Sequence, residues 1–157
     1  MNGRNEKNRT RGMSGPRITE SEKQMLIKME KTFRSCNQMY FNGCLKLPKF
    51  AIKRKADFIG LFTCDNTRVQ LREGKLYYIR RNQPTIVFNM EYATICDEEF
   101  ENTIVHEMVH QWVFQNYAYV VRKGHGKEFH AMCAKLKHDY GLTITTYAEN
   151  LNENKIK

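Results

Sequence analysis

Several features are missing from this 157-residue sequence, and each absence narrows the class of protein. No run of about 18 consecutive apolar residues occurs, so no segment is suited to cross a membrane. Residues 1–17 lack the apolar middle of a signal peptide, so we expect a protein that is not secreted. The five cysteines form no Cys-x-x-Cys pair, which argues against a disulfide framework and a zinc ribbon. No segment repeats, and we expect one domain in a reducing compartment, the cytoplasm.

Histidine is scarce as well, yet two of the five histidines lie in the pentad His106-Glu107-Met108-Val109-His110. On a helix, residues four apart project from the same face with Cβ atoms about 5–6 Å apart. Two imidazoles in that arrangement can reach one metal ion, and Glu107 lies beside the open position of the metal. There it can take a proton from a water molecule, so the pentad is typical of a metal-dependent hydrolase.

The residues around the pentad predict a helix. Asp97-Glu98-Glu99 offers an N-cap and an acidic first turn, and no glycine or proline follows until after Arg122. The helical spacing predicts that His106, His110 and Tyr117 share a side away from the apolar stripe, so Tyr117 is a candidate for stabilising the transition state. The alternative is a pair of surface histidines on an amphipathic helix. The apolar stripe comprises Phe100, Ile104, Val105, Met108, Val109 and Trp112.

A catalytic zinc site usually has three protein ligands, so a third must come from elsewhere in the chain. The remaining histidines are His125, His130 and His138. A second helix is predicted from about Phe129 to Gly141, with His138 opposite its apolar side and His130 on the flank. His125 lies between two glycines at the start of that helix, where a ligand would be expected.

These residues together resemble the SprT-like zinc metalloproteases, whose animal member is called Spartan. The resemblance rests on the pentad, the fifteen-residue step from His110 to His125, and the frame Gly124-His125-Gly126-x-x-Phe129. Two weaker similarities are the aromatic-Asn-Gly corner at 40–43 and a core hairpin at 58–62. The resemblance implies a zincin-like protease domain over 18–147. Within it, His106, His110 and His125 would bind Zn²⁺, and Glu107 would be the general base.

The pattern along the chain predicts an α+β domain. A helix is expected from Ile18 to Phe41, followed by strands near 50–52, 69–71, 76–79 and 85–88 and then by the two helices of the metal site. We expect the strands to form a small antiparallel-type sheet behind the metal helix. A basic tail at 1–17 is predicted to be disordered, and residues 148–157 are expected to form a short C-terminal tail.

The net charge of +9 favours an anionic partner, and nucleic acid is the usual one. Residues 1–17 contain five basic residues and one acidic residue. Aromatic side chains beside cations can stack on unpaired bases, so single-stranded DNA would be preferred over duplex. The alternatives are a tail that only aids solubility and tyrosines that pack across a hairpin. The candidate contacts are Arg4, Arg9, Arg11, Lys53, Arg54, Tyr77, Tyr78 and Arg80.

The favoured function is a zinc-dependent endopeptidase that acts on a protein substrate. The resemblance adds proteins bound or crosslinked to DNA as substrates, and association with the nucleoid as an alternative location. Two other hypotheses stay open: a DNA-binding scaffold with a structural zinc site, and a zinc hydrolase of non-peptide amides. A purely structural site usually has four protein ligands and has no need of a base such as Glu107.

Overall fold

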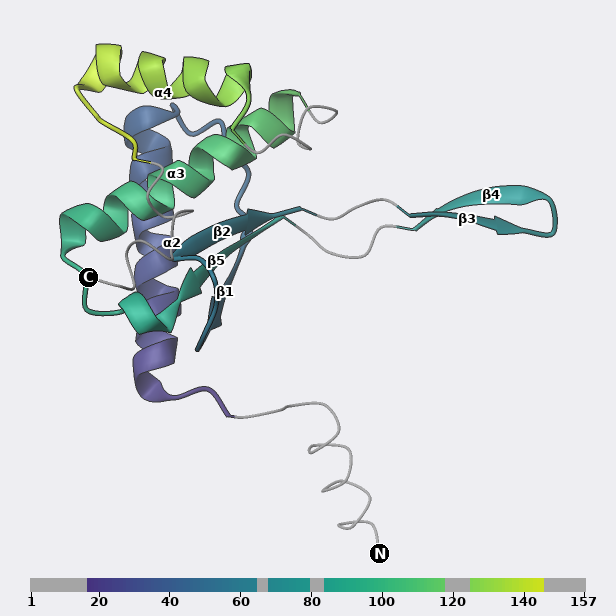
Figure 1. Cartoon of the computed structure of the whole chain (residues 1–157), viewed down its shortest axis with the longest axis horizontal. Coiled ribbons are helices and arrows are strands. Elements are labelled where there is room, and N and C mark those ends of the chain that lie inside the picture. The colour runs from purple at the N-terminus through teal and green to yellow at the C-terminus, as the bar shows by residue number, and fades with distance from the viewer. Residues whose placement is uncertain (1–16, 65–67, 80–83, 118–124, 146–157) are drawn as a thin grey trace, which may run out of the picture.

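A computed structural model describes residues 17–64, 68–79, 84–117 and 125–145. Within them a long helix precedes the strands, and two helices follow the strands, as the sequence predicts (Figure 1). The predicted tails at 1–17 and 148–157 lie almost entirely outside the described residues. None of the described helices has the length and apolar character needed to cross a bilayer.

The first helix, α2 (Glu20–Tyr40), has well-defined signals at both ends. Thr19 caps its N-terminus in a reciprocal capping box with Glu22. Beyond its C-terminus, Asn42 and Gly43 adopt positive φ angles of 53° and 72°, which turn the chain away from the helix axis. The corner expected at 40–43 is therefore a helix-terminating turn. The apolar side of α2 joins the core through Met25, Met29, Phe33 and Cys36.

The main sheet has three strands in the order β1-β5-β2. Their bounds are β1 (Lys49–Lys53), β2 (Gly60–Thr63) and β5 (Thr85–Asn89). β2 pairs antiparallel with β5, but β1 pairs with β5 in parallel. The expectation of an antiparallel-type sheet is therefore wrong for β1, and the hairpin expected at 58–62 is only the single strand β2. Two parallel strands need a connection of about a dozen residues or more, and the connection between β1 and β5 is long enough.

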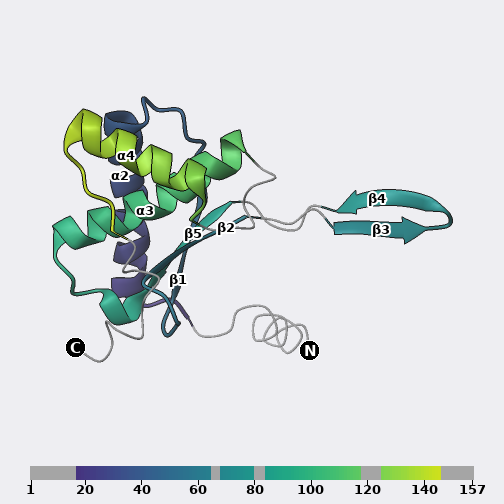
Figure 2. The same cartoon turned by 45° about the horizontal axis from the view of Figure 1, so that its top comes forward.

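A separate hairpin consists of β3 (Arg68–Arg72) and β4 (Lys75–Ile79), as predicted. Glu73 and Gly74 at its tip have φ angles of 50° and 75°. Two successive positive φ angles are typical of the type I′ turn that matches the twist of paired strands. The hairpin lies apart from the three-stranded sheet in both views (Figures 1 and 2).

The helix α3 (Asp97–Asn116) follows a short 3-10 turn, η1 (Met90–Tyr92), and contacts α2, β2 and α4 (Lys127–Tyr140). The apolar stripe predicted for α3 is buried except for the partly buried Trp112, but His106, Glu107 and Gln111 on its other sides are buried too. The expectation of a separate polar face is therefore wrong, because elements pack around this helix from several directions (Figure 2). The full burial of His106 rejects the alternative of two surface histidines, although His110 is partly exposed.

The end of α4 and the state of the cysteines agree with the sequence. Gly141 closes α4 in the left-handed conformation, with φ of 67°. Cys36, Cys44, Cys96 and Cys133 are free thiols. Burial raises the pKa of the Cys36 thiol to about 12, so this cysteine behaves as a small apolar core residue.

Candidate metal centre

Helical geometry brings the first two histidines together. His106 and His110 lie one turn apart on α3, and their ring centroids are separated by 5.0 Å. The His106 side chain is fully buried, whereas His110 is partly exposed. The pair therefore lies where the interior of the protein meets solvent.

The third histidine comes from the segment that leads into α4. His125 stands directly before Gly126, the N-cap of that helix. Its ring centroid lies 5.1 Å from that of His106 and 4.9 Å from that of His110. The structure thus brings together the three histidines that were predicted as ligands, although fourteen residues lie between His110 and His125 in the chain.

The distances between ring nitrogens decide whether this cluster suits a metal ion. One ring nitrogen of each histidine lies within 4.8 Å of the others. The Nε2 atoms of His106 and His125 are 3.2 Å apart. Two nitrogens bound to one tetrahedral zinc at about 2.0–2.1 Å are themselves about 3.3 Å apart. The donor set therefore fits zinc, and the three imidazoles could hold the ion.

The ring of Phe129 contacts all three imidazoles of the cluster. Its ring centroid lies 4.5 Å from those of His110 and His125 and 5.1 Å from that of His106. The Phe129 side chain is 1% exposed, so it closes the inner side of the cluster to water. The sequence marks Phe129 as an apolar residue of the second helix and as part of the frame that follows His125. Its contact with all three imidazoles depends on how α4 packs on α3.

The far nitrogen of His106 is fixed by the backbone. His106 Nδ1 lies 2.7 Å from the carbonyl oxygen of Thr145. A carbonyl can only accept, so Nδ1 must carry the proton and the Nε2 lone pair faces the other imidazoles. Metal-binding histidines are commonly oriented by such a second hydrogen bond. Thr145 lies thirty-nine residues from His106, and no sequence motif indicates this contact.

Glu107 lies against the strand β2. Its carboxylate oxygen Oε2 is 3.9 Å from His106 Nε2, and the side chain is 1% exposed. A Cβ atom placed on Gly60 would come within 3.4 Å of Glu107 Cγ and Oε2, and within 2.8 Å of Thr103 Cγ2. Only glycine allows β2 to pass this close. No local pattern in the sequence indicates this role of Gly60, because the role depends on the approach of two distant elements.

His130 and His138, which were not predicted as ligands, lie outside the cluster, although the ring centroid of His130 is 6.5 Å from that of His125. His130 is exposed on α4, and the largely exposed His138 pairs with Asp139. Tyr117 stands at the C-cap of α3, with φ of −140°, and its ring packs against Trp112. The helical spacing that grouped Tyr117 with the histidines does not apply there, because the helix has already ended.

The predicted nucleic-acid contacts divide into described and undescribed residues. Lys53 is exposed at the end of β1, and Arg54 follows it. Tyr77 and Tyr78 belong to β4, but their side chains lie outside the described part of the chain. The candidates wholly outside the described residues are Arg4, Arg9, Arg11 and Arg80.

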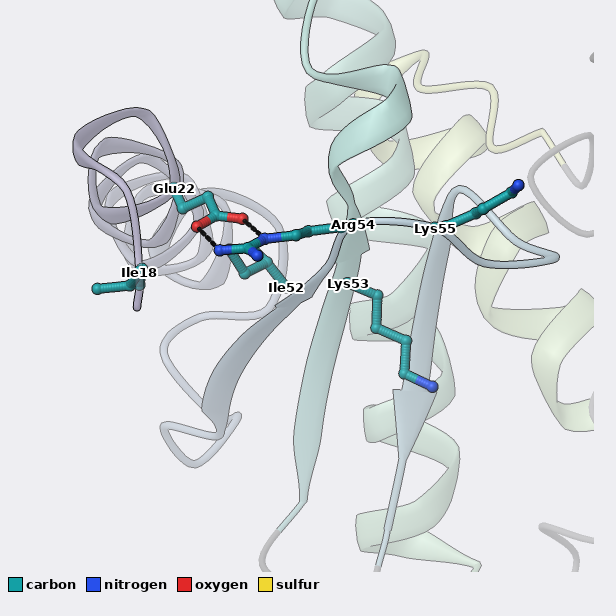
Figure 3. Close-up of a pocket in the computed structure, with 6 residues that line it drawn as sticks. All are labelled: Ile18, Glu22, Ile52, Lys53, Arg54 and Lys55. Carbon is teal, nitrogen blue, oxygen red and sulfur yellow. Dashed lines mark hydrogen bonds and ion pairs between the residues drawn. The ribbon is translucent and has the colours of Figure 1, made fainter. Parts of the chain in front are cut away.

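Arg54 is engaged within the molecule. Its Nε and Nη2 atoms donate to the two carboxylate oxygens of Glu22, at 2.6 and 2.9 Å (Figure 3). Nη2 also donates to the carbonyl of Arg17 at 2.8 Å. The guanidinium holds the pKa of Glu22 at about 2, well below its usual 4.5. The pair forms one wall of a surface pocket lined by Ile18, Glu22, Ile52, Lys53, Arg54 and Lys55.

Comparison with known protein families adds an independent observation. The model of the SprT-like family matches residues 29–148, most of the chain. The chain belongs to the SprT-like family. The matched segment contains α3, α4 and all three clustered histidines, so the resemblance expected from the sequence is confirmed. No curated protein matches the chain. Membership of the SprT-like family indicates a domain of metalloprotease type.

Proposed function

We propose that this SprT-like chain is a zinc-dependent endopeptidase. The observation that supports it most is the approach of three imidazoles, two from α3 and one from the segment before α4, beside a buried glutamate. His106, His110 and His125 would hold the ion. Bound zinc supplies Lewis-acid chemistry, which lowers the pKa of water and polarises a carbonyl group.

The protein side of the chemistry belongs to Glu107. A carboxylate beside the histidine cluster can take a proton from the attacking water and return it to the departing amine. The contact with β2 at Gly60 keeps the carboxylate in place. Phe129 excludes water from the inner side of the site, which strengthens electrostatic interactions there. Gly60 belongs to the strand β2 and Phe129 to the helix α4, so both contacts come from regular secondary structure. Such contacts favour the fixed position that a catalytic group needs.

Metal content and proteolysis, measured on the same samples, test this proposal. We expect about one zinc per chain and cleavage of a denatured test protein that a chelator abolishes. Replacing His106, His110 or His125 by alanine should remove both. His130→Ala is the matched control, because His130 is exposed on α4 beside the site and should retain zinc and activity.

The outcomes separate the proposal from its alternatives. Zinc without cleavage of any protein would favour a scaffold with a structural metal site. Zinc with hydrolysis of small amides alone would favour the non-peptide hydrolase. Zinc retained by His125→Ala but lost from His130→Ala would contradict the assignment of the third ligand.

We further propose that the substrates are proteins bound to DNA, and that the enzyme acts in the cytoplasm or at the nucleoid. The net charge of +9 supports this, together with exposed cations at the end of β1. Lys53 and Lys55 extend away from the Glu22–Arg54 pair (Figure 3). Lys53 is a cleaner probe than Arg54, because replacing Arg54 would also break its ion pair with Glu22.

Salt dependence tests the DNA proposal. Affinity for single-stranded DNA should fall linearly with salt on a log–log plot, by about 0.7 in slope per phosphate contact. Deleting residues 1–17 or replacing Lys53 by alanine should make the slope shallower. Lys31→Ala removes an equal charge from the exposed side of α2 and should leave the slope nearly unchanged.

Stacking and activation give two further readouts. Replacing Tyr77 or Tyr78 by alanine should weaken binding by about 1–3 kcal/mol if bases stack there. A protein bound to DNA should be cleaved faster than the same protein free in solution. Binding that is undetectable at low salt, with no effect of DNA on cleavage, would leave a general metallopeptidase.

A further inference from the structure

A short segment that follows α4 lies against α3, next to the histidine cluster. Leu142 and Ile144 pack against the core, which brings the backbone of this segment next to α3. Within the described part of the chain, the hydrogen bonds of residues 143–145 run to two side chains of α3, those of Asn102 and His106.

Asn102 provides most of these hydrogen bonds. Its Oδ1 accepts from the backbone N–H and from the hydroxyl of Thr145, each at 3.1 Å. Its Nδ2 donates to the carbonyl of Thr143 at 2.6 Å. One side chain thus holds an extended segment on both sides of residue 144. Asn102 lies one helical turn before His106, so the segment is held next to that imidazole.

We propose that Asn102 is a positioning residue of the metal centre. It fixes Thr145 so that the Thr145 carbonyl accepts from His106 Nδ1, 2.7 Å away. That hydrogen bond selects the Nδ1–H tautomer and holds the ring with Nε2 toward His125. The inference rests on the proposed zinc site, but it concerns residues outside the His-Glu-x-x-His pentad.

Packing alone would not achieve this orientation. Apolar contacts of Leu142 and Ile144 are not directional, so they bring the segment close without aiming a carbonyl group. Hydrogen bonds are directional, and Asn102 Oδ1 accepts from both the N–H and the hydroxyl of Thr145. These two bonds fix the peptide unit before Thr145 and the side chain of Thr145, which limits the directions in which the Thr145 carbonyl can point. Loss of Asn102 should therefore leave the segment docked but the carbonyl poorly aimed.

The test is zinc affinity, measured by competition with a chelating dye on the full chain. Replacement of outer partners of metal ligands typically costs 10–100-fold in affinity, and we expect Asn102→Ala to lose about 10-fold or more. Thr145→Val removes only the hydroxyl and keeps the backbone groups, so we expect a loss of less than about threefold.

A matched control lies on the same helix. Asn116 donates from Nδ2 to the carbonyl of Trp112 at 2.8 Å, at the exposed end of α3. Asn116→Ala therefore removes a side-chain bond to the backbone without touching residues 143–145, and it should keep the affinity of the wild type. Cobalt-substituted protein gives a second readout, since its visible absorption reports ligand geometry. That spectrum should change for Asn102→Ala and not for Asn116→Ala.

A measurement on the zinc-free wild type protects the test against a variant that fails to fold. Nitrogen-15 NMR of the imidazoles should show His106 as the Nδ1–H tautomer. Finding the Nε2–H tautomer would overturn the inference, as would wild-type zinc affinity in a folded Asn102→Ala. If the wild type itself binds no zinc, the proposed function fails instead, so the two failures are distinguishable.

Discussion

Two glutamates on different helices of this molecule both have buried side chains. Glu22 lies at the start of α2, with a side chain 6% exposed, and Glu107 lies in the middle of α3, at 1%. Glu22 accepts two hydrogen bonds from Arg54 and one from the backbone N–H of Thr19. Glu107 lies beside three imidazoles and a glycine of β2.

The difference shows that burial alone does not make a carboxylate useful for proton transfer. The Arg54 guanidinium lowers the pKa of Glu22 to about 2, so Glu22 stays ionised at neutral pH and is a poor proton acceptor. Its role is to cap α2 and tie that helix to the end of β1. Glu107, in contrast, lies next to histidines that could hold a metal ion. In that position a carboxylate can accept a proton from a water molecule during the proposed hydrolysis. The next three predictions test this division.

The largest effect should follow from removing the carboxylate of Glu107. Glu107→Gln is nearly isosteric but cannot take a proton, so proteolysis should fall by at least about 10²–10⁴-fold, the usual cost of losing a general base. Zinc content should stay the same. Glu22→Gln is the matched control and should retain nearly full activity in the same assay. Equal losses of proteolysis in Glu107→Gln and Glu22→Gln would contradict the distinction between the two glutamates.

A smaller effect should follow from crowding Glu107. The Cβ of Gly60→Ala would stand 2.8 Å from Thr103 Cγ2 and 3.4 Å from Glu107 Cγ, so either β2 or the glutamate must move. We expect a cost of about 1–3 kcal/mol in unfolding free energy, typical of overpacking, and a loss of activity with zinc retained.

Adding Thr103→Ser to Gly60→Ala tests the cause. Serine lacks the offending methyl group but keeps the hydroxyl that donates to the carbonyl of Glu99 at 2.9 Å. The double variant should regain stability and activity relative to Gly60→Ala, a coupling measurable by chemical denaturation and peptide cleavage. Independent, additive effects of the two substitutions would argue against the close contact.

The smallest effect concerns the Glu22–Arg54 pair and appears only in acid. The folded-state pKa of Glu22 is lowered from 4.5 to about 2, so its contribution to stability is full above pH 4.5 and is lost as the pH falls toward 2. Glu22→Gln lacks this contribution, and its melting temperature should fall less over that interval than that of the wild type. Calorimetry over this pH interval measures both melting temperatures. Parallel curves of melting temperature against pH for the two proteins would contradict the role of the Glu22–Arg54 pair.

The sequence predicted those parts of the site that rest on local periodicity and on short motifs. The spacing of His106 and His110 follows from one helical turn, and the glycines around His125 marked the start of α4. The helix caps at Thr19 and Gly141 depend on neighbouring residues, so α2 and α4 were predicted nearly to their ends. The β3–β4 hairpin has its own turn signal at Gly74 and was also predicted.

The features that the sequence did not reveal depend on contacts between distant segments. The parallel pairing of β1 with β5 depends on the path between them, which strand patterns do not specify. The roles of Gly60, Phe129 and Asn102 each require an element from elsewhere in the chain. The burial of the whole circumference of α3 follows from the packing of α2, β2 and α4 around it. Periodicity can show a helix's apolar stripe, but it cannot show how many partners that helix has.

The central claim is that His106, His110 and His125 bind one zinc ion next to Glu107. Anomalous diffraction at the zinc edge, on crystals of the zinc-loaded wild-type chain, tests it most directly. We expect a single strong peak about 2.0–2.1 Å from one ring nitrogen of each of these histidines. A peak at the exposed His138–Asp139 pair instead, or none at the three histidines, would contradict the account.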